Sequence, residues 1–417
     1  MRLKLKSLIC SSIQAGIGSK RWYTIRKKVK TWQLARQISL AYRFVEPSEI
    51  RDQVSIIIPT YQGAKELPRC IRSLKVQKGV PKLEIMVYDS GSTDGTVELA
   101  SKMGARVLPP EGKPFNHGRS RTYAASFSRG KYLVFLVQDA YLKTEETLMQ
   151  LLTPLATGGE SVAAVTGRQV PAPDADIFAQ WQVTGTYRSL FLDDETVFHR
   201  LPDGTEYAAC SLLARRRLSF LDNVFCAIRK EVFSECGGFP EITISEDTWF
   251  ATVLAKKGYQ IGYCGTAEVV HSHTRSAAYF LRRYYVGYKT QLELYGEKSH
   301  SVFHSLNELL FTYIQFIKAN SDFFSNTSKA TAPLQELLRE PEEQEQCYEG
   351  YDFLQTQFEM TLQDIESTNL LEGIEKKDLQ SLYTKILFSL AGKHIAELGN
   401  ANPEAVRGLP NHFITGI

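Results

Sequence analysis

An acidic residue closes a predicted strand that is otherwise almost entirely apolar. Gln138-Asp139-Ala140 ends the run at 131–137, which is apolar after its first residue. A carboxylate at the end of a buried strand is costly unless it is paired, hydrogen-bonded or bound to a metal. Mg²⁺ and Mn²⁺ prefer carboxylate and phosphate oxygens. Asp139 is therefore a candidate anchor for a divalent ion, and the competing interpretation is an aspartate that starts a turn.

Two adjacent acids, Glu246 and Asp247, begin the helix predicted over 246–257. Acids in the first turn of a helix are stabilised by its dipole, which is the simpler explanation for either residue. Two acids ahead of an apolar helix also suit a general base aimed into a cleft, a role worth roughly 10²–10⁴-fold in rate. We assign Asp247 as the base and Glu246 as its neighbour near an acceptor hydroxyl.

His271 and His273 flank a serine after the strand predicted over 268–271. Alternate residues of an extended segment point the same way, so both imidazoles are expected on one face. We expect His271 to complete a metal shell with Asp139, and His273 to lie near phosphate. A structural role for each histidine is the alternative.

Two further segments are candidates for binding an anionic ligand. Asp89 follows the strand predicted over 83–88 and is suited to accept hydrogen bonds from a base or ribose. Its alternative is a helix cap, a role that Asp94 fits better. The segment 115–121 places arginines at the start of a helix, where anions are favoured. A solvated basic turn is the competing view of that segment.

Alternating strands and helices must position these residues. Apolar runs at 54–60, 83–88, 106–108 and 131–137 predict strands, and 162–170, 260–264 and 268–271 continue the pattern less regularly. Helical spacing is found at 67–75, 92–103 and 119–128. This alternation predicts a mostly parallel α/β sheet covered by helices on both faces. Ligands of such sheets collect outside the carboxyl ends of the strands.

The net charge of +3 is unevenly distributed. Residues 1–50 hold eleven Lys or Arg and two Glu, which gives +9 and leaves −6 for the remainder. The segment 21–44 predicts a basic amphipathic helix, which suits an anionic membrane surface. A helix packed on the main domain with a solvated basic face remains an equal alternative. No nucleic-acid partner is expected, because no recognition motif accompanies the charge. The apolar residues at helical spacing are Trp22, Ile25, Val29, Trp32 and Ile38.

Composition also suggests the compartment and the domain division. The sequence has no run of eighteen apolar residues, and its seven cysteines are scattered singly. A cytoplasmic protein is expected, either free or peripheral on the cytoplasmic face of a membrane. After residue 296 the sequence becomes helical and more acidic, without a catalytic motif. We divide the chain into a basic extension at 1–50, a core domain at 51–295 and a helical accessory region at 296–417.

Eight motifs in order resemble the family 2 glycosyltransferases of the GT-A fold, specifically the rhamnosyltransferase-like branch. The resemblance covers about residues 54–289. In that branch QDA stands where relatives have a fuller DxD. The motifs are IIIPTYQG at 56–63, DSGSTDGT at 89–96, FNHGRSR at 115–121, QDA at 138–140, GRQVP at 167–171, FLDNVFCAIRKEVF at 220–233, GGFPEITISED at 237–247 and AEVVHSH at 267–273.

The resemblance implies a GT-A sheet with a Rossmann-like nucleotide half, an acceptor half and a C-terminal helical extension. It implies inverting transfer of a sugar, such as rhamnose from dTDP-rhamnose, to a saccharide or lipid-linked glycan acceptor of a surface polysaccharide. Asp247 would be the base, and Asp139 would hold Mg²⁺ or Mn²⁺ with His271. The expected nucleotide-sugar site comprises Thr60, Tyr61, Asp89, Gly91, His117, Arg121, Gln138 and Asp139, and the expected acceptor site comprises Asn223 and Trp249.

Two departures from the family pattern affect the sugar and the acceptor more than the reaction type. Thr122 stands where the branch usually has Asn, and Asp222-Asn223-Val224-Phe225 replaces a usual Ser-Asn-Val-Asn. A sugar nucleotidyltransferase is disfavoured, because PTYQGAKELPR lacks a glycine-rich loop after the first strand. An inactive nucleotide-sugar-binding or interaction protein is the other alternative, against which the retained acids and histidines argue.

Overall fold

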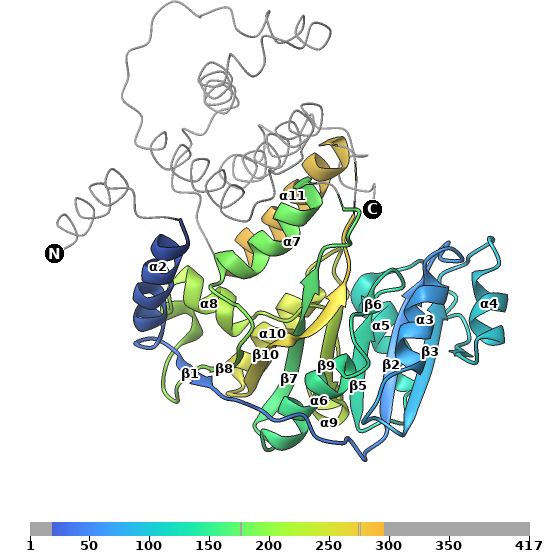
Figure 1. Ribbon diagram of the computed structural model, residues 1–417, viewed down its shortest axis with the longest axis horizontal. Helices are drawn as coiled ribbons and strands as arrows, with labels where there is room; N and C mark the ends of the chain where they lie inside the picture. Colours follow the sequence, from blue (N-terminus) through green and yellow to red (C-terminus); the bar gives the residue numbers. More distant parts are fainter. Residues whose placement is uncertain (1–18, 176, 274, 276, 296–417) are drawn as a thin grey trace, which may run out of the picture. The chain divides into compact units, whose positions relative to one another are not determined.

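The computed structural model describes residues 19–175, 177–273, 275 and 277–295. Contacts divide the chain into two compact units, and residues 26–274 form the one that contains the sheet. Ten strands lie in the order β1-β8-β10-β7-β9-β5-β2-β3-β4, with β6 paired to β10 (Figure 1). The strands are β1 Ser39–Tyr42, β2 Val54–Thr60, β3 Leu83–Asp89, β4 Arg106–Val107, β5 Tyr132–Leu136, β6 Tyr141–Leu142, β7 Val162–Val170, β8 Thr196–Arg200, β9 Phe225–Arg229 and β10 Gln260–Val270.

The predicted mostly parallel α/β sheet is confirmed. Strands β5, β2, β3 and β4 form a parallel half, and only β6, β8 and β9 run against the other described strands. The helices are α2 Ser19–Leu34, α3 Leu67–Lys75, α4 Thr96–Lys102, α5 His117–Ser126, α6 Thr147–Thr157, α7 Ile177–Ser189, α8 Leu212–Leu218, α9 Lys230–Glu235, α10 Glu246–Lys256 and α11 Ala277–Tyr295, with a 3₁₀ turn η1 at Tyr207–Ala209.

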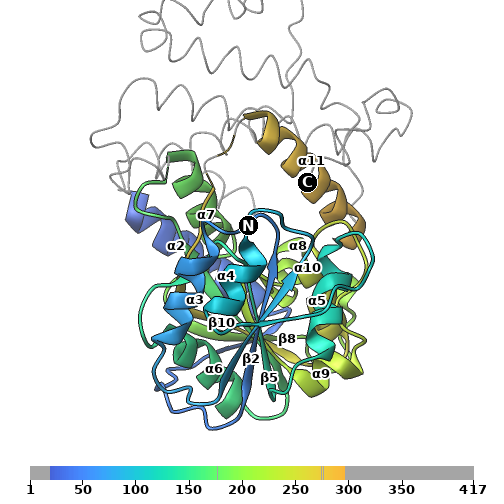
Figure 2. The same ribbon diagram turned by 90° about the vertical axis from the view of Figure 1, so that its right-hand side faces the viewer.

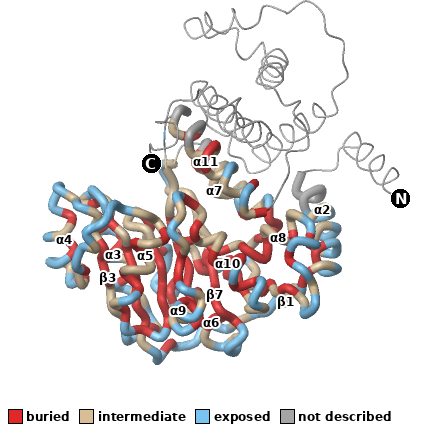
Figure 3. The backbone as a smooth tube through the Cα atoms, turned by 180° about the vertical axis from the view of Figure 1, so that it is seen from behind, coloured by how far each residue is buried: buried red, intermediate tan, exposed pale blue. Residues whose placement is uncertain are grey.

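The strands alternate between two hydrophobic cores, one on each face of the sheet. Ile56 and Ile58 of β2 pack with α3 and α6, whereas Ile57 packs on the other face with α5, α9 and α10. Figure 2 shows these two helical layers on opposite sides of the sheet, and Figure 3 shows the buried strands between them. Because both faces are covered, the strands have near-continuous apolar sequences.

The structure differs locally from the sequence prediction at three places. The strands expected at 260–264 and 268–271 form the single long β10. Helix α4 begins at Thr96, because the preceding residues form a loop held by the carboxylates of Asp89 and Asp94. The segment 174–217 has no clean periodicity, yet it contains α7, β8, η1 and α8.

The N-terminal segment is shorter as a helix than the predicted 21–44. Helix α2 ends at Leu34, and Ser39–Tyr42 pairs antiparallel with β8 at the edge of the sheet. Leu34 and Ile38 are buried together in a small core, and residues 26–50 fall within the unit that contains the sheet, whereas the sequence placed the start of the core domain at residue 51. Burial of these two side chains favours the packed-helix alternative. No described helix could cross a membrane, and the predicted helical region at 296–417 lies outside the described residues.

A close backbone contact fixes the start of α5 against the segment before α10. A Cβ atom on Gly118 would lie 1.8 Å from the Pro240 carbonyl oxygen. We therefore expect Gly118→Ala to lower the free energy of unfolding by about 1–3 kcal/mol, as overpacking does. Gly185→Ala in α7 is the matched control, because its Cβ would meet nothing within 4 Å. That control should gain about 0.5–1 kcal/mol. Urea denaturation measures both, and equal stability of the two variants would contradict this contact.

Candidate active site

The candidate residues meet at one edge of the sheet. Thr60 and Asp89 end β2 and β3, Asp139 lies in the loop after β5, and His271 directly follows β10. Strand β9 runs against β5 and β7, so its start lies at this edge and brings Asp222 to it. Parallel strands and one reversed strand thus place residues from distant parts of the sequence together.

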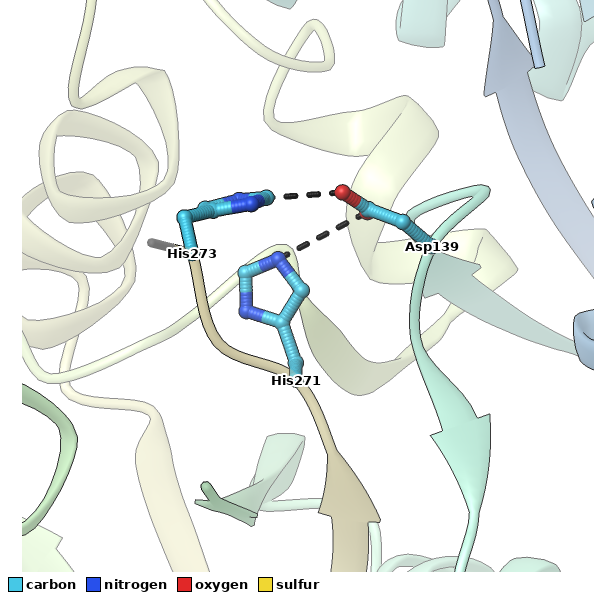
Figure 4. Close-up of side chains that lie close together, drawn as sticks. All are labelled: Asp139, His271 and His273. Carbon is cyan, nitrogen blue, oxygen red and sulfur yellow. Dashed lines mark ion pairs between the residues drawn. The ribbon is translucent and has the colours of Figure 1, made fainter. Parts of the chain in front are cut away.

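Asp139 and both histidines form one cluster of donor atoms. The His271 Nε2 atom lies 3.5 Å from Asp139 Oδ1, and the His273 Nε2 atom lies 3.6 Å from Asp139 Oδ2. Figure 4 shows both imidazole rings facing the carboxylate. Ser272 faces elsewhere and accepts a hydrogen bond from the Ala172 backbone at 3.0 Å. His273, expected near phosphate, thus lies in the same cluster as His271.

The chemistry of these donors fits a divalent metal. One oxygen and two imidazole nitrogens lie within 4.8 Å of one another. Burial raises the pKa of Asp139, but the two histidines outweigh this effect and bring it down to about 2. The carboxylate is therefore ionised at neutral pH, which is the form that binds cations.

Asp247 lies in the opposite electrostatic environment. It is the second residue of α10, and its Oδ2 accepts from the Asn223 backbone at 3.0 Å and its Oδ1 from the Thr248 backbone at 2.7 Å. Burial, Glu246 and Asp222 together raise the pKa of Asp247 to about 7. A carboxylate that titrates near neutral pH has the proton affinity that general-base catalysis requires.

Glu246, which the sequence predicted near an acceptor hydroxyl, is more deeply buried than Asp247. Its Oε1 accepts hydrogen bonds from Arg121 Nη1 at 3.1 Å and from Asn223 Nδ2 at 2.9 Å. The three residues are 4%, 5% and 3% exposed. A buried carboxylate needs such partners to offset its desolvation. The structure therefore commits Arg121 and the Asn223 side chain to Glu246, whereas the sequence predicted that they face phosphate and acceptor.

Asp89 is engaged by its own loop. Its two carboxylate oxygens accept from Thr60 Oγ1 at 2.7 Å, Gly91 N at 2.9 Å, Ser92 N at 2.7 Å and Ser92 Oγ at 2.7 Å. Gly91 has a φ of 99°, which favours glycine. Asp94 accepts from the Thr96 backbone at 3.2 Å, but the N-cap of α4 is Gly95 and no side chain caps that helix, so the capping role predicted for Asp94 is wrong. Asp89 thus shapes the loop that would receive a nucleotide.

The remaining predicted residues lie around this edge. The Gln138 side chain both accepts from and donates to the Tyr61 backbone, at 2.9 and 3.0 Å. The Tyr61 side chain is exposed. The His117 Nδ1 atom lies 3.2 Å from Arg121 Nη1, and Trp249 is half-buried in the first turn of α10.

Sequence reasoning missed a glutamine within the GRQVP motif. Gln169 Oε1 lies 2.8 Å from His271 Nδ1, and its amide nitrogen donates to Asp222. Asp222 was visible in the sequence only as a departure from the family pattern. The motif at 167–171 was the available signal for Gln169, but its partners are distant in sequence. Thr122, the other departure, accepts from the Phe239 backbone at 2.9 Å and so ties α5 to the segment before α10.

The buried pair gives a stability prediction. Arg121→Met leaves Glu246 without its cation, and we expect a loss of about 3–5 kcal/mol in the free energy of unfolding. Lys131→Met is the control, because the Lys131–Asp52 pair is exposed and is worth about 0–1 kcal/mol. Adding Glu246→Gln to Arg121→Met should recover part of the loss. Urea denaturation measures all three, and a loss no larger than that of the control would contradict the pairing.

Comparison with known proteins places the chain among glycosyltransferases. Residues 55–236 match the profile of glycosyl transferase family 2. The O-antigen chain rhamnosyltransferase RfbN of Salmonella typhimurium is 32% identical over 236 residues, which cover 56% of this chain and 70% of that relative. The rhamnosyltransferase WbaN of Salmonella anatum is 32% identical over 234 residues, with 55% and 70% covered.

A solved structure supports the fold. The mannosyltransferase PcManGT of Pyrobaculum calidifontis, in complex with GDP-Man and Mn²⁺, aligns with a TM-score of 0.51 at 17% identity, over 93% of this chain and 97% of that one. The sequence matches lead to one conclusion: the chain is a glycosyltransferase that belongs to glycosyl transferase family 2.

Proposed function

We propose that this glycosyltransferase moves a sugar from a nucleoside-diphosphate sugar to a saccharide or lipid-linked glycan acceptor, with inversion at the anomeric carbon. The observation that carries the proposal is the placement of two contrasting carboxylates at one edge of the sheet. Asp139 is ionised among histidines, and Asp247 is held near its titration point. The names of the two Salmonella relatives support rhamnose as the sugar and a surface polysaccharide as the product.

The proposed reaction is a direct displacement. The acceptor hydroxyl oxygen attacks the anomeric carbon while the bond from that carbon to the diphosphate oxygen breaks. Asp247 takes the hydroxyl proton, and the diphosphate oxygen keeps the electron pair of the broken bond. Backbone N–H groups of Asn223 and Thr248 hold the Asp247 carboxylate in place, which pre-positions the base before the acceptor binds.

Asp139, His271 and His273 would hold the metal beside the diphosphate. A bound divalent ion supplies a Lewis acid for the departing diphosphate. Mg²⁺ favours a nearly complete oxygen shell, whereas Mn²⁺ accepts imidazole nitrogen more readily. Two imidazoles in the donor set therefore favour Mn²⁺ over Mg²⁺.

The proposed location is the cytoplasmic face of a membrane, without a membrane-spanning anchor among the described residues. The end of α2 packs on the domain through Leu34, but its exposed face supports peripheral contact, because Trp32 is 58% exposed and Val29 is exposed beside Lys28. Exposed tryptophan near basic side chains suits an anionic membrane surface.

Substitution of the two carboxylates separates their proposed roles. Asp139→Ala should abolish stabilisation by Mn²⁺ with a dTDP-, UDP- or GDP-sugar in a thermal shift screen, because it removes the oxygen donor. Asp247→Asn should keep donor-dependent stabilisation but lower transfer by roughly 10²–10⁴-fold, since an amide cannot accept the proton. Donor binding without transfer in the wild type would favour an inactive binding protein. Normal turnover by Asp247→Asn would remove Asp247 from the role of base.

The pKa of Asp247 predicts an acid limb in the pH profile. Because the ionised carboxylate is the base, kcat/KM should fall as pH decreases through about 7. Asp222→Asn removes a neighbouring negative charge, so the pKa of Asp247 should fall and the acid limb should move to lower pH. Asp52→Asn is the control, because that exposed acid pairs with Lys131 away from the site. An acid limb that stays in place in Asp222→Asn would contradict this coupling.

A further inference from the structure

Gln169 connects the base side of the site to the metal side. It lies in β7, between the start of β9 and the end of β10 in the order of the sheet. Its amide nitrogen donates to Asp222 Oδ2, and its amide oxygen lies 2.8 Å from His271 Nδ1. Asp222 in turn is one of the charges that raise the pKa of Asp247. One side chain therefore touches a neighbour of the base and a candidate metal ligand.

Asp222 decides which way the Gln169 amide faces. A carboxylate accepts hydrogen bonds and does not donate them, so the NH₂ group of Gln169 must face Asp222. The other Asp222 oxygen accepts from the Val224 backbone at 3.0 Å, which fixes the carboxylate itself. The amide oxygen of Gln169 is then left to face His271, and an amide oxygen can only accept.

The Gln169 amide oxygen in turn determines which nitrogen of His271 carries a hydrogen. Since Gln169 presents an acceptor, His271 Nδ1 must carry a hydrogen and donate it. In the neutral ring the lone pair then lies on Nε2, the atom 3.5 Å from Asp139. The opposite tautomer would put two lone pairs against each other at Nδ1. In the Nδ1–H tautomer the Nε2 lone pair and the Asp139 carboxylate face each other, and a cation between them would satisfy both.

The backbone of Gln169 is held as firmly as its side chain. Its N–H donates to the Tyr187 hydroxyl at 2.6 Å, and Tyr187 is a buried side chain. In the sheet Gln169 pairs with Val269, two residues before His271. A positioning residue must itself be fixed, and these contacts supply that condition.

We propose that Gln169 is a positioning residue that, oriented by Asp222, sets the His271 tautomer so that Nε2 is free to bind the metal. The inference rests on the proposed function for the presence of a metal at Asp139 and His271. It also assigns a purpose to the acid at 222, which departs from the family pattern: Asp222 polarises a hydrogen-bond chain that runs through Gln169 to the metal ligand. Partners of this kind typically change metal affinity by roughly 10–100-fold when they are removed.

The test is Mn²⁺ affinity without substrate, measured by the electron paramagnetic resonance signal of free Mn²⁺. Gln169→Met keeps the length of the side chain but offers His271 no oxygen acceptor, so we expect affinity to fall by roughly 10–100-fold. Gln77→Met is the matched control. Gln77 also bridges two elements through its amide, donating to Thr144 O and accepting from Leu148 N, and it does not contact the site. The control should bind Mn²⁺ as the wild type does.

A double variant that exchanges the carboxylate and the amide distinguishes the hydrogen-bonding role of Gln169 from a packing role. In the double variant Gln169→Glu with Asp222→Asn, the carboxylate at 169 accepts from both the amide at 222 and His271 Nδ1. Net charge is conserved, and we expect most of the wild-type affinity to return. Circular dichroism confirms that each variant is folded before titration.

The outcomes distinguish the inference from the function on which it rests. Wild-type affinity in folded Gln169→Met, or a folded double variant that stays as weak as Gln169→Met, would overturn the role of Gln169. If the wild type itself bound no Mn²⁺, the metal site of the proposed function would be overturned, and with it the role of Gln169 toward that metal.

Discussion

The arrangement of the site depends on the buried carboxylate of Glu246, which needs hydrogen-bonding partners to offset its desolvation. Glu246 lies at the first turn of α10, and its charge is matched by Arg121 from α5 and by the amide of Asn223 from the start of β9. Removing one partner of a buried ion pair is far more costly than an exposed pair is worth. The pair therefore fixes α10 against α5 and β9, and the adjacent Asp247 inherits a defined position.

That position explains why two acids in sequence have different chemistry. Glu246 is paired with an arginine and faces inward, whereas Asp247 accepts from the Asn223 and Thr248 backbone and the Thr248 hydroxyl and lies near Asp222. Asp139, across the site, has two histidines beside it and a lowered pKa. Environments that push the pKa values of neighbouring carboxylates apart are a usual way to divide acid–base and binding roles within one site.

The reversed strand β9 brings residues together behind the candidate base and the candidate metal donors. Because β9 enters the sheet at the edge where its neighbours end, the acid at 222 meets Gln169 of β7, and Gln169 meets His271 after β10. Asp222 and Gln169 thus contact neighbours of the candidate base and of the candidate metal donors. Residues such as Asp89 and Gln138 act similarly in the nucleotide half, where they hold the loops that follow β2 and β3.

Local sequence patterns sufficed to predict the alternating strands and helices of the core and to place Asp139, Asp247 and His271 at the ends of elements. Those features follow from local periodicity and from the cost of placing a polar group beside an apolar strand. The sequence also predicted a group of polar residues at one edge, because parallel strands end together. It overextended the helix at 21–44, since the burial of Leu34 and Ile38 and the pairing of β1 depend on residues near 200.

The pairing of the polar residues through hydrogen bonds could be seen only in the folded structure. Arg121 and Glu246 are separated by 125 positions, and Gln169 and His271 by 102. A side chain's type shows that it can donate or accept, but the partner that satisfies it depends on how distant segments pack. For that reason Arg121 and Asn223 were expected to contact ligand and instead support Glu246, while Gln169 and Asp222 became visible only once the sheet brought them together.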